Sequence, residues 1–187
     1  MLLASGFSTR FGSSKLLAIY NDRTLIEHSI ATLAPCDRII AVVRVDDKAV
    51  QSLLNAHSID CVFNTEPKRG MGHSIACAVK ATSLSSGWCL LPADMPCIDA
   101  SVCHRLVQSL QHGARIAAPF YRDRRGHPVA FSNHYHDALS ALDGDSGARS
   151  IIQRNAEHLT AIDTDDAGVL LDVDSPVDMA KIAKQGC

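Results

Sequence analysis

Two glycines and two basic side chains lie close together at the start of the chain, in an order that suits phosphate binding. Gly6 and Gly12 are separated by five residues, Arg10 lies between them, and Lys15 follows after two more. Backbone N–H groups of such a loop, together with cations, can hold a phosphate chain. The spacing is neither that of a Walker A loop nor that of a Gly-x-Gly-x-x-Gly fingerprint. The loop therefore predicts a polyphosphate site, and the alternative is an ordinary solvated loop.

Carboxylates recur at two later points. Asp94 follows the apolar run 88–91 and lies between two prolines, while Asp172 and Asp174 alternate near the end of the chain. A carboxylate at a strand end can bind Mg²⁺ through one oxygen, because the ion keeps several waters and takes further ligands from substrate phosphates. The alternative is a turn or helix-capping role, which is common for Asp beside Pro. We assign Asp178 to capping or packing.

Three other stretches combine glycine with polar or basic side chains. They are Asn64-Thr-Glu-Pro-Lys-Arg-Gly-Met-Gly-His-Ser74, Arg122-Asp-Arg-Arg-Gly-His-Pro128 and Gly144-Asp-Ser-Gly-Ala-Arg149. Arginine makes bidentate contacts with phosphate, and a helix start attracts anions. Each stretch could also be a solvated turn followed by a helix cap.

The elements that must position these residues alternate along the chain. We expect strands at 1–4, 38–44, 59–64, 87–91, 114–119, 127–132, 159–163 and 169–173. We expect helices at 24–33, 46–56, 74–84, 99–112, 135–142, from the 144–147 turn to 154, and from 176 onward, with Asp46 and Asp99 as caps. This alternation predicts βαβ units around a largely parallel sheet. In such a sheet, ligands bind beyond the carboxyl ends of the strands.

Composition limits the class of protein. The chain has 187 residues, 47% of them hydrophobic, and a net charge of -2, which predicts one globular domain over 1–187 and no nucleic-acid surface. The sequence shows no apolar run of about 18 residues and no signal peptide, so we expect no membrane association and a cytoplasmic protein. Seven cysteines without a Cys-x-x-Cys pair favour reduced thiols and no structural zinc site.

The motif blocks together resemble one family. Residues 3–16 resemble the L-A-A-G-x-S-x-R-[FM]-G-x-x-K-L signature of the MobA-like nucleotidyltransferases, with Ser5 where that family usually has Ala. Residues 91–96 and 172–178 resemble its L-x-[GA]-D-[MQ]-P and D-[IV]-[DN]-[TS]-P-x-D motifs. Residues 64–74 resemble its base- and ribose-recognising segment, although Pro67 replaces an aromatic residue. The R-x-G-H-P and G-D-x-G-A-R blocks are typical of the molybdenum cofactor cytidylyltransferase branch.

The resemblance implies a Rossmann-like three-layer α/β sandwich of the nucleotide-diphospho-sugar transferase type, and roles for individual residues. The implied catalytic residues are Lys15, Arg10 and Asp94. The implied nucleotide-binding residues are Leu3, Ala4, Ser5, Gly6, Arg10, Lys15, Asn64, Gly72, Ser74 and Asp94. Arg125, His127 and Arg149 would bind the acceptor, and Asp94 and Asp174 would bind Mg²⁺.

The implied reaction moves CMP from CTP to the terminal phosphate of molybdopterin-bound molybdenum and releases pyrophosphate. A molybdoenzyme or its maturation chaperone is the expected protein partner. Two alternatives stay open. One is a guanylyltransferase or another NTP transferase with a different phosphorylated acceptor. The other is a non-catalytic carrier of the molybdenum cofactor, although Lys15, Asp94 and Asp174 speak against a pure carrier.

Overall fold

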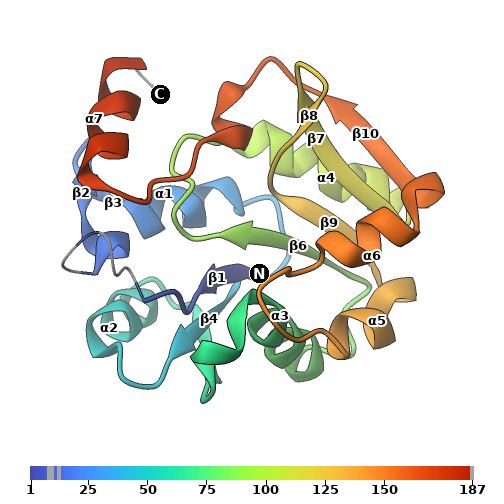
Figure 1. The fold of residues 1–187 in the computed structure, drawn as a ribbon, viewed down its shortest axis with the longest axis horizontal. Helices are drawn as coiled ribbons and strands as arrows, with labels where there is room; N and C mark the ends of the chain where they lie inside the picture. Colours follow the sequence, from blue (N-terminus) through green and yellow to red (C-terminus); the bar gives the residue numbers. More distant parts are fainter. Residues whose placement is uncertain (8–10, 12–13, 186–187) are drawn as a thin grey trace.

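The structure, a computed structural model, describes residues 1–7, 11 and 14–185 and has one eight-stranded sheet with helices on both faces (Figure 1). The strands are β1 (Leu2–Ala4), β4 (Ile40–Arg44), β5 (Asp60–Asn64), β6 (Gly87–Pro92), β7 (Ile116–Tyr121), β8 (Arg124–Arg125), β9 (Val129–Ser132) and β10 (Leu159–Asp163). Their order is β10-β7-β9-β6-β1-β4-β5, with β8 beside β7. Strand β9 is antiparallel to β6 and β7, and β8 to β7, whereas the remaining pairs are parallel. The predicted, mostly parallel sheet is confirmed.

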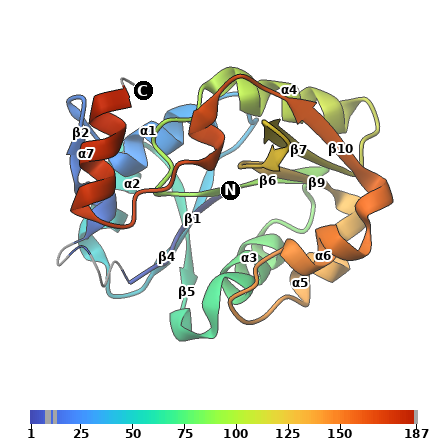
Figure 2. The ribbon, with the colours of Figure 1, turned by 45° about the horizontal axis from the view of Figure 1, so that its top comes forward.

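Alternating side chains of the strands build two separate cores. The helices are α1 (Leu25–Thr32), α2 (Lys48–Ala56), α3 (Gly70–Ala81), α4 (Ala100–Gln111), α5 (His136–Ser140), α6 (Arg149–Arg154) and α7 (Pro176–Gln185). One core packs α1, α2 and α4 against the sheet, and the other packs α3, α5 and α6 against its opposite face (Figure 2). Because successive strand residues point to opposite faces, both faces of the sheet need apolar residues. The result is the expected three-layer sandwich.

Helix starts follow local capping chemistry. Thr24 and Glu27 form the predicted capping box of α1, and Asp99 accepts a hydrogen bond from Ser101 N at the start of α4. The prediction that Asp46 caps the second helix is wrong, because Asp47 accepts from Val50 N in that role. Asp46 pairs instead with Arg44, at 2.9 Å from its Nε.

The segment before α7 differs from its prediction. Residues 169–173 form no strand; they begin in the 3₁₀ turn Ala167–Leu170 and continue without regular structure. Val169 and Val173 are nevertheless fully buried, so their apolar character reflects packing in a loop. The loop is tied down by backbone hydrogen bonds, from His127 N to Val169 O and from Val173 N to Asp94 O, both 2.9 Å.

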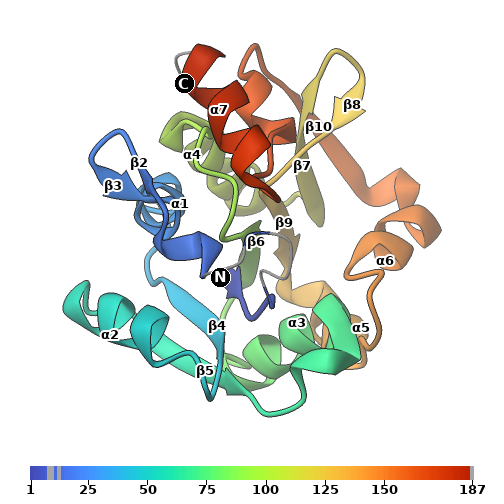
Figure 3. The ribbon, with the colours of Figure 1, turned by 60° about the vertical axis from the view of Figure 1, so that its left-hand side comes forward.

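A small lobe lies beside the main sandwich. The hairpin of β2 (Ile19–Tyr20) and β3 (Arg23–Thr24) follows the 3₁₀ turn Lys15–Leu17. Tyr20 packs with Val173 and Ile182, so the hairpin and α7 share a third apolar cluster (Figures 1 and 3). The hairpin and the last helix therefore meet, and Val173, just before that helix, contacts Asp94 beyond the carboxyl end of β6. The sequence alone did not predict this hairpin.

No helix among the described residues is long and apolar enough to cross a membrane. The described cysteines at positions 36, 61, 77, 89 and 103 carry free thiols, whereas Cys97 is disulfide-bonded. Cys97 thus departs from the expectation that the cysteines are reduced.

Candidate functional site

Lys15 is held between two carboxylates that come from distant parts of the chain. Its Nζ donates to Asp94 Oδ2 at 2.7 Å and to Asp174 Oδ1 at 2.8 Å. Burial lowers the pKa of Lys15, but the Asp94 charge and the hydrogen bonds with both carboxylates outweigh this effect and raise the pKa above 10.5. Lys15 therefore stays an ammonium group at neutral pH.

The fold explains why these three residues meet. Strand β1 lies directly beside β6, with Leu3 opposite Pro92, so the chain leaving β1 and the chain leaving β6 emerge at the same edge. Ala93 N continues the pairing by donating to Leu3 O at 3.1 Å. The backbone bond between Val173 N and Asp94 O then brings the segment before α7 to the same place.

A third carboxylate, that of Asp172, lies near the two that contact Lys15. Partial burial, and then the charges of Asp94 and Asp174, raise the pKa of the nearby Asp172 above 3.8. In addition, Oδ1 of Asp94 is buried and accepts no hydrogen bond from the described residues. A buried carboxylate oxygen without a donor, next to further carboxylates, is an arrangement that a divalent cation would satisfy.

A buried polar network lies near the carboxyl ends of β1 and β5. It consists of Ser5, Asn64 and Ser74. The Oγ atoms of Ser5 and Ser74 are 2.7 Å apart, and Asn64 Nδ2 donates to Ser74 Oγ at 2.9 Å. Asn64 is held in place because its Oδ1 accepts from Glu66 N at 2.8 Å. The structure thus brings together three residues predicted to bind nucleotide, from the loop after β1, the end of β5 and helix α3.

Ser74 does not lie at the helix start that was predicted for it. Helix α3 begins earlier, at Gly70, so Ser74 lies within its first turns and its hydroxyl donates to Gly70 O at 3.3 Å. Gly72 N donates to Gly144 O at 2.8 Å, and a Cβ on Gly72 would lie 2.7 Å from Asp143 O. The glycine at 72 is therefore required for close packing on the 143–144 loop, and its nucleotide contact stays a prediction.

The basic residues predicted for the acceptor lie together on another segment of the same edge. Burial lowers the pKa of Arg125, and the positive charge of Arg149 lowers it further, so the two guanidinium groups act on each other. Burial and then Arg125 lower the pKa of His127 below 6.5, while the Asp94 charge acts in the opposite direction. His127 Nδ1 is buried and has no hydrogen-bond partner among the described residues. Beside the His127 ring, the two guanidinium groups can bind an anionic group.

The remaining predicted residues belong to β1 and the loop after it. Leu3 and Ala4 are strand residues, and the Gly6 carbonyl accepts from Arg44 Nη1 at 2.6 Å. A Cβ on Gly6 would meet nothing within 4 Å, so no close approach in the structure itself requires glycine there. Arg10 lies outside the described residues, and its predicted catalytic and nucleotide-binding roles stay predictions.

Sequence reasoning missed a cavity beside this loop. It has a volume of about 560 Å³ and is lined by Phe7, Arg44, Asn64 and neighbouring residues of the 64–69 segment. The Arg44 guanidinium lies 4.9 Å from the centre of the Phe7 ring. Arg44 ends the predicted strand 38–44, and this position is the one sequence signal that could have identified the cavity.

A three-layer sandwich with a cationic loop after its first strand and carboxylates beyond the adjacent strand is the arrangement of a nucleotidyltransferase. The chain belongs to the MobA-like NTP transferase domain family, whose model matches residues 1–160. The Asp172–Asp174 segment lies beyond the matched residues, and its contact with Lys15 comes from the structure.

Curated relatives carry two different activities in their names. The chain is 28% identical to nicotine blue oxidoreductase of Paenarthrobacter nicotinovorans, over 97% of this chain and 94% of that protein. It is 25% identical to molybdenum cofactor cytidylyltransferase of Escherichia coli strain K12, over 95% of this chain and 91% of that protein.

Solved structures share the whole fold. A homologue of Mycobacterium tuberculosis Rv0371c from Mycobacterium sp. strain JC1 is 27% identical, with a TM-score of 0.83 over 98% of this chain and 93% of that one. A nucleotidyl transferase from Methanothermobacter thermautotroptrophicus is 19% identical, with a TM-score of 0.82 over 98% and 94% of the two chains. The predicted fold type and the nucleotidyltransferase class are confirmed.

Proposed function

We propose that this nucleotidyltransferase moves CMP from CTP to the terminal phosphate of molybdopterin-bound molybdenum and releases pyrophosphate. The observation that carries the proposal is the position of Lys15, an ammonium group held by Asp94 and Asp174 where β1 and β6 end. Arg125 and His127, predicted to hold the acceptor, lie close enough for the Asp94 charge to act on His127. In this proposal the donor and acceptor subsites share one edge of the sheet.

The proposed reaction is an in-line displacement at the α-phosphorus of CTP. An anionic oxygen of the acceptor phosphate forms the new P–O bond, and the bond between the α-phosphorus and the bridging oxygen breaks, so that pyrophosphate leaves with that electron pair. A phosphate monoester is already largely ionised near neutral pH, because its second pKa is about 6. The chain therefore needs no general base, and its task is to position the reactants and offset negative charge.

Asp94 and Asp174 would hold the divalent cation of the reaction, and the residues fit one. Asp94 offers a buried oxygen without a donor, and Asp174 offers a carboxylate whose side chain is 45% exposed. A bound Mg²⁺ would supply positive charge against the triphosphate. Lys15 adds a fixed positive charge at the same place, and the Arg10 side chain is proposed to add another.

CTP and the molybdenum cofactor are favoured by two observations. The blocks 122–128 and 144–149, typical of the cytidylyltransferase branch, place Arg125 and Arg149 in mutual range. One curated relative is a molybdenum cofactor cytidylyltransferase, at 25% identity. A molybdoenzyme or its chaperone would then receive the product.

A second candidate function is an oxidoreductase, because the relative with 28% identity is named as one. The ion-paired Lys15 and the carboxylates around it favour triphosphate chemistry, since hydride transfer has no need of an ammonium group between two carboxylates. The two candidate activities differ in cofactor and product, so assays of nucleotide binding and of NADH or NADPH oxidation distinguish them.

Calorimetry with CTP, GTP, ATP and UTP, each with Mg²⁺, tests the proposal on the complete chain. We expect selective CTP binding that Lys15→Ala abolishes and that Lys80→Ala, an exposed lysine on α3, leaves unchanged. GTP selectivity would replace the cytidylyl assignment with a guanylyl one. Binding of none of the four, together with oxidation of NADH or NADPH by the protein, would overturn nucleotidyl transfer.

A further inference from the structure

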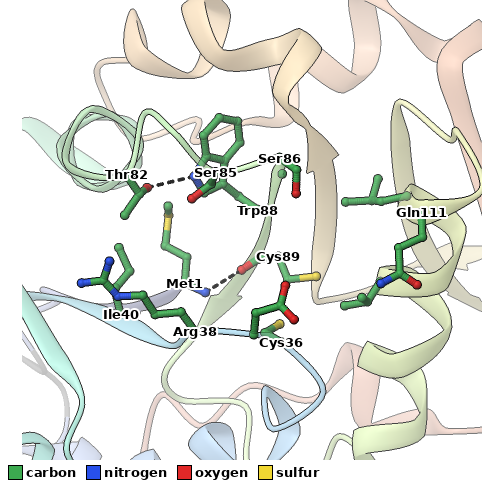
Figure 4. A pocket seen from close by; sticks show the side chains of 14 residues that line it. Met1, Cys36, Arg38, Ile40, Thr82, Ser85, Ser86, Trp88, Cys89 and Gln111 are labelled. Atoms are coloured by element: carbon green, nitrogen blue, oxygen red, sulfur yellow. Dashed lines mark hydrogen bonds between the residues drawn. The ribbon is translucent and has the colours of Figure 1, made fainter.

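A second chemically distinctive region lies at the opposite, amino edge of the sheet. A cavity of about 490 Å³ opens there, lined by Met1, Trp88 and residues of α4 and of the segment after α1 (Figure 4). Cys36 and Cys89 both line this cavity. The nucleotide and acceptor assignments use none of its residues.

Three thiols converge beside this cavity. The Sγ atoms of Cys36, Cys89 and Cys103 all lie within 4.8 Å of one another, and those of Cys36 and Cys103 are 3.7 Å apart. They come from three separate elements: the connection after α1, strand β6 and helix α4. No Cys-x-x-Cys spacing indicates this cluster in the sequence, because only the fold brings the three thiols together.

The spacing of the thiols suits a tetrahedral thiophilic ion. Zinc–sulfur bonds of about 2.3 Å in tetrahedral geometry place their sulfurs roughly 3.8 Å apart. The pair Cys36 and Cys103 already has this separation, and the trio needs to contract by about 1 Å at most. Thiolates select Zn²⁺ and similar soft ions over Mg²⁺, which prefers oxygen.

The surroundings give the trio both shielding and access. Cys89 and Cys103 are buried, whereas Cys36 is partly exposed and, with Cys89, faces the cavity (Figure 4). An ion can therefore enter past Cys36, and the cavity leaves room for a water molecule or another small ligand in the fourth position. Three protein ligands plus an open position distinguish exchangeable zinc sites from closed structural ones.

We propose that Cys36, Cys89 and Cys103 form a Zn²⁺ site with one coordination position open to the cavity, separate from the nucleotidyl-transfer site. The other free described thiols, Cys61 and Cys77, lie elsewhere and supply matched controls.

Zinc and cobalt titrations of the metal-free protein, with the Cys97 disulfide left intact, test the site. We expect one Zn²⁺ per chain after desalting, and a Co²⁺ adduct with thiolate-to-cobalt charge-transfer bands and tetrahedral visible bands. Carboxylates such as Asp94 cannot produce the charge-transfer bands, so the spectrum distinguishes the two edges of the sheet. Cys36→Ser should weaken Zn²⁺ binding by at least about 10-fold, whereas Cys61→Ser and Cys77→Ser should bind like the unaltered protein.

The choice of variant guards against simple unfolding. Cys36 is the least buried of the three, so Cys36→Ser is the variant most compatible with the fold. The spectrum of the unaltered protein gives an independent answer, because charge-transfer intensity rises with the number of bound thiolates. A cobalt adduct without these bands, no retained zinc, or equal binding by Cys36→Ser and Cys61→Ser would overturn the proposal.

Discussion

The two edges of the sheet gather opposite kinds of side chain, although each joins segments far apart in the sequence. At the carboxyl edge, Lys15 is held by the carboxylates of Asp94 and Asp174. At the amino edge, Cys36, Cys89 and Cys103 meet beside a cavity that stays partly open to solvent. The carboxyl edge is assembled by polar loops that leave parallel strands, whereas the amino edge is assembled by residues of the apolar core. Charged oxygen and nitrogen groups are thus concentrated where loops keep partial access to water, whereas the sulfur ligands lie against the apolar core.

The largest effect should follow from removing the cation at the carboxyl edge. Lys15→Ala is expected to reduce the rate of CMP transfer by about 100- to 1,000-fold, because a pre-positioned charge near the reacting phosphate is lost. Pyrophosphate release at one CTP concentration, the same for every variant, measures the rate, because Lys15→Ala also removes CTP binding. Lys80→Ala serves as the control. A Lys15→Ala rate close to that of the unaltered protein would contradict the assignment of nucleotidyl transfer to the carboxyl edge.

The metal assignment predicts a dependence on Mg²⁺ that one carboxylate controls. Asp94→Asn should lower transfer by about 100-fold and remove most of its response to added Mg²⁺, since an amide oxygen binds the ion more weakly than a carboxylate. Initial rates over a Mg²⁺ series measure this. Asp165→Asn, at an exposed position, is the matched control. An unchanged Mg²⁺ response in Asp94→Asn would contradict the assignment.

The acceptor assignment predicts a separation of kinetic constants. Arg125→Ala should raise KM for the acceptor by about 10- to 100-fold, the size expected for charged hydrogen bonds to phosphate. CTP binding should stay the same, because Arg125 belongs to the acceptor side. Arg154→Ala, an exposed arginine on α6, is the control. Equal weakening of CTP binding and acceptor binding would contradict the assignment of Arg125 to the acceptor subsite.

A smaller effect on stability is expected in the buried polar network. Ser74→Ala removes the acceptor of Asn64 Nδ2 in a buried position, so the free energy of unfolding should fall by about 1–3 kcal/mol. Urea denaturation measures the change, and Ser83→Ala at an exposed position is the comparison. Equal stability of the two variants would show that Asn64 readily finds another acceptor.

The smallest effect concerns Asp172, whose pKa is raised above 3.8 by partial burial and by the charges of Asp94 and Asp174. The folded state disfavours its ionised form, so this group lowers stability as pH rises through 3.8 and through its folded pKa. Asp172→Asn should therefore stabilise the protein at pH 7 and lose this advantage below pH 3.8. Because Asp172 keeps much of its surface in contact with solvent, screening limits the gain to below about 1 kcal/mol. Thermal unfolding at several pH values measures it, and a loss of stability at pH 7 would contradict the sign.

The sequence motifs pointed to Lys15, Asp94 and Asp174, which the structure brings together, and their roles stay predictions. Nothing in the sequence indicated the cysteine cluster at the amino edge. The motifs around Lys15 and Asp94 were recognisable because the functional residues of each loop are close together in the sequence. Residues 169–173 were wrongly predicted to form a strand, because buried loops and buried strands share the same apolar composition. The meeting of Cys36 with Cys103 depends on the packing of α4, which no local pattern encodes. The same holds for Val173, whose hydrogen bond to Asp94 O joins the end of the chain to the site.

The central claim is that the bond broken lies at the α-phosphorus of CTP. We would incubate the protein with the molybdopterin acceptor and CTP labelled either at the α- or at the γ-phosphate. The account predicts that the α label appears in the acceptor product, that the γ label appears in pyrophosphate, and that Lys15→Ala stops both. Transfer of the γ label to the acceptor, or no transfer of either label while Mg²⁺ and acceptor are present, would contradict it.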